Sequence, residues 1–133
     1  MKTAGEYRTI VAYTRFAPKE RVKALQETGV EMWLCEEKEG LVDVKNLVEL
    51  LGKSGIDSIL LEGWGSLNYT FLTERLVDEL YAFIAPKIVG GMSAKTPVEG
   101  LGVEKVDDAI NLELKNVLNM GDDVLLKLKI KNE

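Results

Sequence analysis

Hydrophobic positions in the first third of the chain alternate between strand-like and helix-like spacing. Residues 9–13 and 30–35 are two β-branched and apolar runs typical of strands. Between them lies a short amphipathic segment that Pro18 opens and Gly29 ends, as expected for a helix. This order predicts two parallel strands joined by a right-handed helical crossover.

The next segment predicts a second helix. Residues 36–40 are charged and are interpreted as a solvated surface turn. Asp43 is a suitable N-cap for the helix that follows. That helix carries its apolar residues at helical spacing, at Val44, Leu47, Val48 and Leu51.

The stretch from Gly55 to Pro86 organises the rest of the chain. An apolar run at residues 58–61 predicts a buried central strand, and a glycine turn follows it at once. An amphipathic helix through residues 67–76 and another strand at residues 80–85 complete the stretch. Strand, glycine turn and helix form a layout typical of phosphate sites, because a helix N-terminus presents unpaired N–H groups to an anion.

The C-terminal third predicts a long loop and a hairpin. Residues 87–110 have no steady period and are interpreted as a functional surface loop. Two strands follow at residues 111–120 and 123–131, separated by the turn signal Gly121-Asp122. The last strand alternates apolar residues with lysines, which is typical of an edge strand. The sequence therefore predicts one α/β domain over residues 1–133, mainly a parallel sheet flanked by helices, with an N-terminal extension at residues 1–8.

Composition narrows the function classes. The chain has 133 residues, 46% of them hydrophobic, and a net charge of −5, which disfavours nucleic acid as a partner. No apolar run approaches the roughly 20 residues that span a bilayer, and the start resembles no signal peptide, so we expect no membrane partner and a cytoplasmic location. Without histidine, Ser-His and Cys-His nucleophiles and histidine metal sites are excluded. The single cysteine, Cys35, has apolar neighbours and is expected to be buried.

Three segments carry a resemblance to a known family. LEGWGSLN at residues 61–68, LVDEL at residues 76–80 and IAPK at residues 84–87 resemble the C-terminal reductase domain of the riboflavin-biosynthesis deaminase/reductases. Trp64 stands where that pattern has its middle glycine. The resemblance implies a dihydrofolate-reductase-like fold, and the family's opening strand has no counterpart before Thr9, so we expect a partial reductase domain.

The resemblance implies a cofactor site for NADPH. Backbone amides at the glycine turn would hold the pyrophosphate, and the residues concerned are Gly63, Trp64, Gly65, Ser66 and Leu67. The alternative is a turn that needs glycine only for its dihedral angles, since an isolated G-x-G is a weak signal. Thr14 and Arg15 would meet the adenosine 2′-phosphate, or else form an ordinary turn.

On the substrate side, the resemblance places Glu62 beside the substrate, and the alternative is a surface or capping carboxylate. Asn68 could bond the turn backbone or the ligand, with the structural role favoured. Phe71 and Leu72 fit core positions, and Lys95, like Lys87, is a weaker candidate for a substrate phosphate. Hydride transfer requires close positioning and water exclusion, so no catalytic nucleophile and no metal are expected.

Two functions remain open. The first is an NADPH-dependent reductase that converts a 5-amino-6-(5-phosphoribosylamino)uracil-type substrate to its ribitylamino product. The second is a non-catalytic, oligomerising remnant of that domain, since an incomplete sheet leaves an edge that a homodimer would cover. Another pterin or nitro-group reductase on the same fold rests on fold analogy alone.

Overall fold

The structure is a computed structural model that describes residue 4 and residues 6–131. The chain divides into two compact units, Met1–Ile59 and Leu60–Glu133, and each is described here by itself. Part of the expected N-terminal extension, residues 1–3 and 5, lies outside the described residues. Within the described part of the chain, no helix has the length and apolar character needed to cross a membrane.

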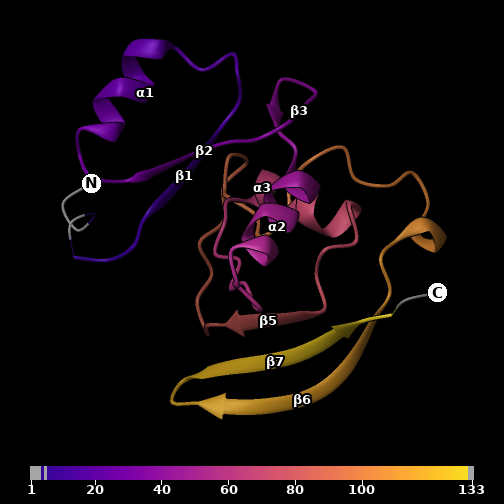
Figure 1. Ribbon diagram of the computed structural model, residues 1–133. Coiled ribbons are helices and arrows are strands. Elements are labelled where there is room, and N and C mark those ends of the chain that lie inside the picture. Colours follow the sequence, from indigo (N-terminus) through magenta and orange to yellow (C-terminus); the bar gives the residue numbers. More distant parts are fainter. Residues whose placement is uncertain (1–3, 5, 132–133) are drawn as a thin grey trace. The chain divides into compact units, whose positions relative to one another are not determined.

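The first unit begins with the predicted strand-helix-strand element (Figure 1). Strand β1 (Ile10–Tyr13) pairs in parallel with β2 (Glu31–Leu34), and helix α1 (Lys19–Gln26) connects them. Gly29 follows the helix with a φ of +83°, a conformation that glycine adopts without strain. The sequence prediction for this element is confirmed.

The second part of this unit is a short hairpin followed by a helix. Strands β3 (Glu37–Lys38) and β4 (Leu41–Val42) pair antiparallel where the sequence predicted only a charged turn. Helix α2 (Val44–Lys53) begins after Asp43, whose Oδ1 accepts hydrogen bonds from the N–H groups of Lys45 at 2.9 Å and Asn46 at 3.5 Å. The predicted N-cap is confirmed.

Replacing Asp43 with alanine is expected to destabilise the first unit by about 1 kcal/mol, because two amides at the start of α2 lose their acceptor. Urea unfolding followed by circular dichroism measures this loss. Asp57→Ala is the matched control, since Asp57 is an exposed aspartate outside the helices. Equal midpoints for the two variants would contradict the capping role.

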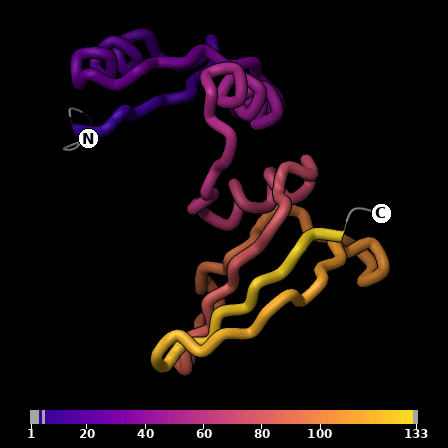
Figure 2. Tube along the Cα trace, turned by 60° about the horizontal axis from the view of Figure 1, so that its bottom comes forward, coloured from indigo at the N-terminus to yellow at the C-terminus, as the bar shows by residue number. Residues whose placement is uncertain are grey.

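The second unit contains one α-helix and an antiparallel sheet. Helix α3 (Gly65–Thr73) is followed by β5 (Glu79–Ile84), a 3₁₀ turn η1 (Val106–Asp108), β6 (Leu112–Met120) and β7 (Asp123–Ile130). The strand order is β5-β7-β6, and Figures 1 and 2 show the three strands side by side. Met120 pairs with Asp123, which confirms the tight Gly121-Asp122 hairpin loop.

Three expectations about the sheet are wrong. Residues 56–64 form no strand, although residues 58–61 have the predicted apolar character. Their side chains are not covered, since Ile59 is 46% and Leu60 is 81% exposed, and a strand requires a paired neighbour. Strand β7 lies in the centre of its sheet rather than at an edge, because it pairs with both β5 and β6. Among the described residues, β1–β2 is a two-stranded parallel sheet, whereas β3–β4 and β5-β7-β6 are antiparallel sheets, so the expected mainly parallel sheet is not formed.

Buried positions in each unit agree with the apolar pattern. Cys35 is buried as expected, and its burial raises the pKa of the thiol. In the second unit Phe71 on α3 and Leu125 on β7 are buried, while Leu72 is half-buried. Phe71 therefore takes the core position that its spacing predicted.

Candidate functional site

The N-terminus of α3 lies where the sequence predicted an anion site. Trp64 is the N-cap residue, has extended backbone angles and provides no side-chain cap. The first backbone hydrogen bond of the helix runs from the N–H of Asn68 to the carbonyl of Trp64 at 3.1 Å. The amides of residues 65–67 precede that bond and have no intrahelical acceptor, so they can donate to an anion at the positive end of the helix dipole.

A segment of the long loop packs on these first helical turns. We call this segment, Lys95–Gly100, the strap. The N–H of Glu99 donates to the carbonyl of Gly65 at 3.1 Å, and Nδ2 of Asn68 donates to the carbonyl of Pro97 at 2.8 Å. The expected surface loop thus contains an ordered element at the candidate site.

The two glycines of the turn make room for neighbouring parts of the protein. A Cβ at Gly65 would lie 2.5 Å from Cγ of Glu99 and 2.8 Å from the carbonyl oxygen of Thr96. A Cβ at Gly63 would lie 2.9 Å from Cδ2 of Leu67. Neither glycine has a positive φ, so the dihedral-angle explanation does not apply to them. The strap covers Gly65, and the space on that side of the turn is filled by the chain itself.

Other predicted residues of this turn are open to solvent. The Trp64 side chain is 74% exposed, and Nζ of Lys95 lies 5.9 Å from the centroid of its ring. Ser66 is exposed, and Leu67 is 41% exposed. Glu62 is also exposed and follows a segment without regular secondary structure instead of ending a central strand. Its place at the end of that strand was wrong, while its role toward substrate stays a prediction.

The residues predicted to meet the adenosine phosphate belong to the first unit, at the end of β1. The carbonyl of Thr14 accepts a hydrogen bond from the N–H of Ala17 at 3.0 Å, which forms a turn. Arg15 lines a cavity of about 290 Å³, and its guanidinium carbon lies 5.0 Å from the centroid of the Phe16 ring. Thr14 itself is half-buried and is not one of the lining residues.

This cavity, which we call the cationic pocket, brings three positive charges together. Lys19 and Lys23 on α1 line it together with Arg15, over apolar and polar groups from Tyr13, Ala17, Val22, Gln26 and Leu34. Lys19 and Lys23 are four residues apart on α1, so their like charges repel. An anion between the cations would offset this repulsion. Neither lysine was predicted as a site residue from the sequence, because their shared cavity with Arg15 forms only when α1 packs beside β2.

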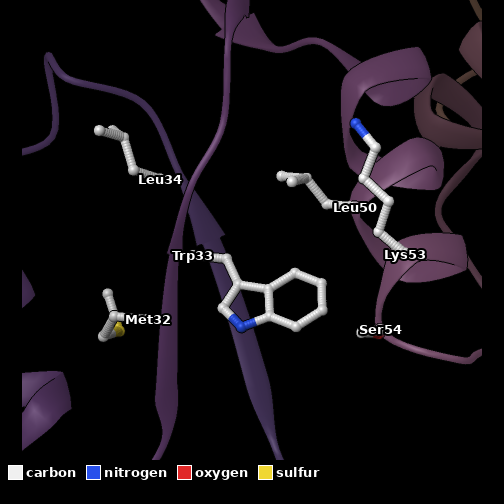
Figure 3. A pocket seen from close by; sticks show the side chains of 6 residues that line it. All are labelled: Met32, Trp33, Leu34, Leu50, Lys53 and Ser54. Atoms are coloured by element: carbon white, nitrogen blue, oxygen red, sulfur yellow. The ribbon is translucent and has the colours of Figure 1, made fainter.

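A second cavity in the first unit has a different character. It has a volume of about 440 Å³ and lies between β2 and α2. Figure 3 shows the Trp33 indole directed toward Leu50 of α2. Met32, Leu34, Lys53 and Ser54 complete the lining, and Nζ of Lys53 lies 3.9 Å from the Glu49 carboxylate. None of the residues predicted for a cofactor or substrate lines this cavity, which is mainly an apolar gap between strand and helix.

Comparison with known proteins identifies the family. Residues 1–126 match the family described as the RibD C-terminal domain. The chain belongs to that family. The resemblance noted in the sequence is therefore confirmed, and it extends over nearly the whole chain.

Relatives of this RibD C-terminal chain are proteins of riboflavin biosynthesis. The riboflavin biosynthesis protein RibD of Actinobacillus pleuropneumoniae is 40% identical over 126 residues, which are 95% of this chain and 33% of that protein. The 2,5-diamino-6-ribosylamino-4(3H)-pyrimidinone 5′-phosphate reductase of Methanothermobacter thermautotrophicus is 40% identical over 123 residues, which are 92% of this chain and 56% of the reductase. The chain thus spans about a third to a half of the relatives that it matches.

Solved structures support the fold of the RibD C-terminal family. A pyrimidine reductase-like protein from Corynebacterium diphtheriae superposes with a TM-score of 0.74 at 20% identity, covering 93% of this chain and 50% of that one. RibD of Acinetobacter baumannii gives a TM-score of 0.67 at 22% identity, covering 92% of this chain and 37% of that one. At such low identity, this agreement concerns the fold alone.

Proposed function

We propose that this chain takes part in NADPH-dependent reduction of a ribosylaminopyrimidine 5′-phosphate in riboflavin biosynthesis, in the cytoplasm. The substrate is of the 5-amino-6-(5-phosphoribosylamino)uracil type or its diamino-pyrimidinone counterpart, and the product carries a ribityl chain. Family membership and relatives with pyrimidine reductase names support the reaction class. The cationic pocket favours NADPH over NADH as the cofactor in this proposal, because three cations beside apolar groups suit an adenosine that bears an extra phosphate.

In this reaction, the residues of the chain would bind the cofactor and the substrate and orient them toward each other. Bound NADPH would supply the hydride, so the protein needs no nucleophile of its own. Within the second unit, the amides of Ser66 and Leu67 would donate to the diphosphate, whereas Gly65 is covered by the strap. Within the first unit, Arg15 would pair with the 2′-phosphate. Glu62 would accept a hydrogen bond from a substrate hydroxyl or amino group, which would fix the acceptor carbon for transfer.

Titration with NADPH and NADH tests this proposal. Binding is followed through the fluorescence of Trp33 and Trp64, the two tryptophans of the chain. Saturable quenching by NADPH, with clearly weaker binding of NADH, is the expected result. Turnover of the ribosylaminopyrimidine phosphate, measured by NADPH absorbance, tests the reaction itself. A flat fluorescence trace with both nucleotides would refute the proposal for this chain.

Removing one cation from the cationic pocket is expected to reduce the preference for NADPH over NADH. We expect Arg15→Ala and Lys23→Ala each to weaken NADPH binding about tenfold, because each loses a charge-assisted interaction with the extra phosphate. NADH affinity should hardly change. Arg21→Ala is the matched control, since Arg21 lies on α1 outside the pocket lining. Equal losses for both nucleotides would show that the pocket does not bind the 2′-phosphate.

A second candidate function is association without catalysis. Ile84 on β5, Leu114 and Val117 on β6 lie on one face of the sheet by their register with β7, and each is more than half exposed. A second copy of the chain could cover this apolar face and form the expected homodimer. Light scattering and the nucleotide titration together distinguish the two candidate functions. A tight dimer that binds neither nucleotide would support association without catalysis. A monomer that binds NADPH would contradict that candidate.

A further inference from the structure

One side-chain amide joins the glycine turn, helix α3 and the strap. Nδ2 of Asn68 donates to the carbonyl of Pro97 at 2.8 Å and to the carbonyl of Gly63 at 3.4 Å. Asn68 itself lies in the second half-turn of α3, after the amides that are free to bind an anion. Both protons of a single NH₂ group are therefore used to hold two separate backbone segments against the helix.

The remaining contacts of the strap depend on the same placement. The N–H of Glu99 bonds the carbonyl of Gly65, and the α-carbon of Gly100 approaches the Tyr69 ring so closely that a Cβ would overlap it. At the other end of the strap, the Lys95 ammonium lies over the exposed Trp64 ring. The strap thus follows the first turns of α3, and its position fixes two charges relative to the turn: the Lys95 ammonium over the Trp64 ring and the Glu99 carboxyl group against Gly65.

The side-chain oxygen of Asn68 makes no hydrogen bond, so the useful part of this side chain is its NH₂ group. Oδ1 is buried and has no hydrogen-bond partner among the described residues. A buried acceptor without a partner is unfavourable, so packing alone would be better served by an apolar residue of the same size. The two bonds from Nδ2 are what leucine at this position could not supply.

We propose that Asn68 is a positioning residue, which clamps the strap to the turn before α3 so that the free amides of Ser66 and Leu67 and the Lys95 ammonium face one anionic group. This inference rests on the proposed function, in which that group is the diphosphate of the dinucleotide. Asn68 does not touch the ligand, because its free oxygen is buried. Asn68 would instead hold the strap and the N-terminus of α3, which would both contact the ligand, at a fixed distance from each other.

The clamp is tested without any ligand by limited trypsin digestion of Asn68→Leu. Leucine removes both donors and also the unpartnered acceptor, so the variant should fold with a similar melting temperature. Cleavage after Lys95, in the strap, is expected to accelerate about fivefold or more relative to cleavage after Lys87, an exposed site before the strap, because a released backbone is the better protease substrate. Asn119→Leu, a change at an exposed asparagine on β6, is the matched control and should leave that ratio unchanged. An unchanged ratio in Asn68→Leu would overturn the clamp.

The positioning role is tested by the NADPH titration of the same variant. The dissociation constant and KM for NADPH should rise about tenfold, with kcat changed less than twofold, because Asn68 acts on binding geometry and not on the transfer step. Faster cleavage at Lys95 with unchanged NADPH affinity would overturn the positioning role while leaving the clamp. If the unaltered chain binds no NADPH, the proposed function fails and the positioning role with it, whereas the digestion ratio still decides the clamp.

Discussion

Replacing Ser66 with glutamate is expected to reduce the affinity for NADPH by about hundredfold or more, while the fold is kept. Ser66 is the second residue of α3 and is exposed, so a carboxylate there would lie beside the amides that are proposed to hold the diphosphate. Two like charges about 4 Å apart near a protein surface repel by about 4 kcal/mol, before screening by salt reduces the effect. Fluorescence titration measures the loss directly.

The same change is expected to leave stability equal or slightly raised. An acidic residue in the first turn of a helix is stabilised by the helix dipole by about 0.3–1 kcal/mol, and α3 has no acidic residue in its first turn. Binding and stability would therefore move in opposite directions, which separates loss of the site from loss of the fold. Ser66→Ala should bind NADPH nearly as well as the unaltered chain, because the amide is kept. Ser58→Glu, the same change at an exposed serine outside the helix, should not affect binding. Unchanged affinity in Ser66→Glu would remove the diphosphate from this helix end.

Local signals in the sequence were sufficient for the α-helices and for the β6–β7 hairpin, but not for the β3–β4 hairpin. The helix ending near Gly29, the Asp43 cap and the Gly121-Asp122 loop all depend on neighbouring residues, and the structure has each of them. Their energetics are decided within a few residues, by capping bonds and backbone conformation. Such features can be predicted from one sequence because no distant part of the chain is needed.

Pairing could not be predicted in the same way. The apolar run at residues 58–61 has strand character, yet it forms a strand only where another strand offers its N–H and C=O groups. The alternation of leucine and lysine in β7 suggested an edge, but β7 pairs on both sides. The alternation of side chains indicates which face of a strand is apolar. The strand order depends on pairing with distant parts of the chain, which the alternation does not predict.

The candidate site illustrates both cases. The glycine turn before α3 was found from its residues and its place before a helix. The strap was not, because the close approach of Thr96 and Glu99 to Gly65 joins residues about thirty positions apart. Lys19 and Lys23 were missed for a related reason: only the packing of α1 beside β2 shows that they share a cavity with Arg15. The turn glycines were interpreted as room for a diphosphate, whereas the structure places Thr96 and Glu99 of the strap against Gly65.

The close approach at Gly100 leads to the second large effect. Gly100→Ala is expected to destabilise the second unit by about 3 kcal/mol, from two causes that add. Gly100 has a φ of +101°, which alanine adopts only with strain of about 1–3 kcal/mol, and its Cβ would overlap the Tyr69 ring. Overpacking of this kind costs about 1–3 kcal/mol more, unless the strap moves away from α3. Urea unfolding measures the sum, and trypsin cleavage after Lys95 shows whether the strap has moved.

Gly102 supplies the control that separates the two causes. It also has a positive φ, +68°, but a Cβ there would meet no atom within 4 Å. Gly102→Ala should therefore cost only the backbone strain, about 1 kcal/mol. Combining Gly100→Ala with Tyr69→Ala should recover the overpacking part, since the ring that blocks the new methyl group is gone, and a double-mutant cycle gives the coupling between the two positions. If Gly100→Ala and Gly102→Ala cost the same, the strap does not pack on α3 at this point, and the arrangement that places Lys95 beside the helix N-terminus loses one of its supports.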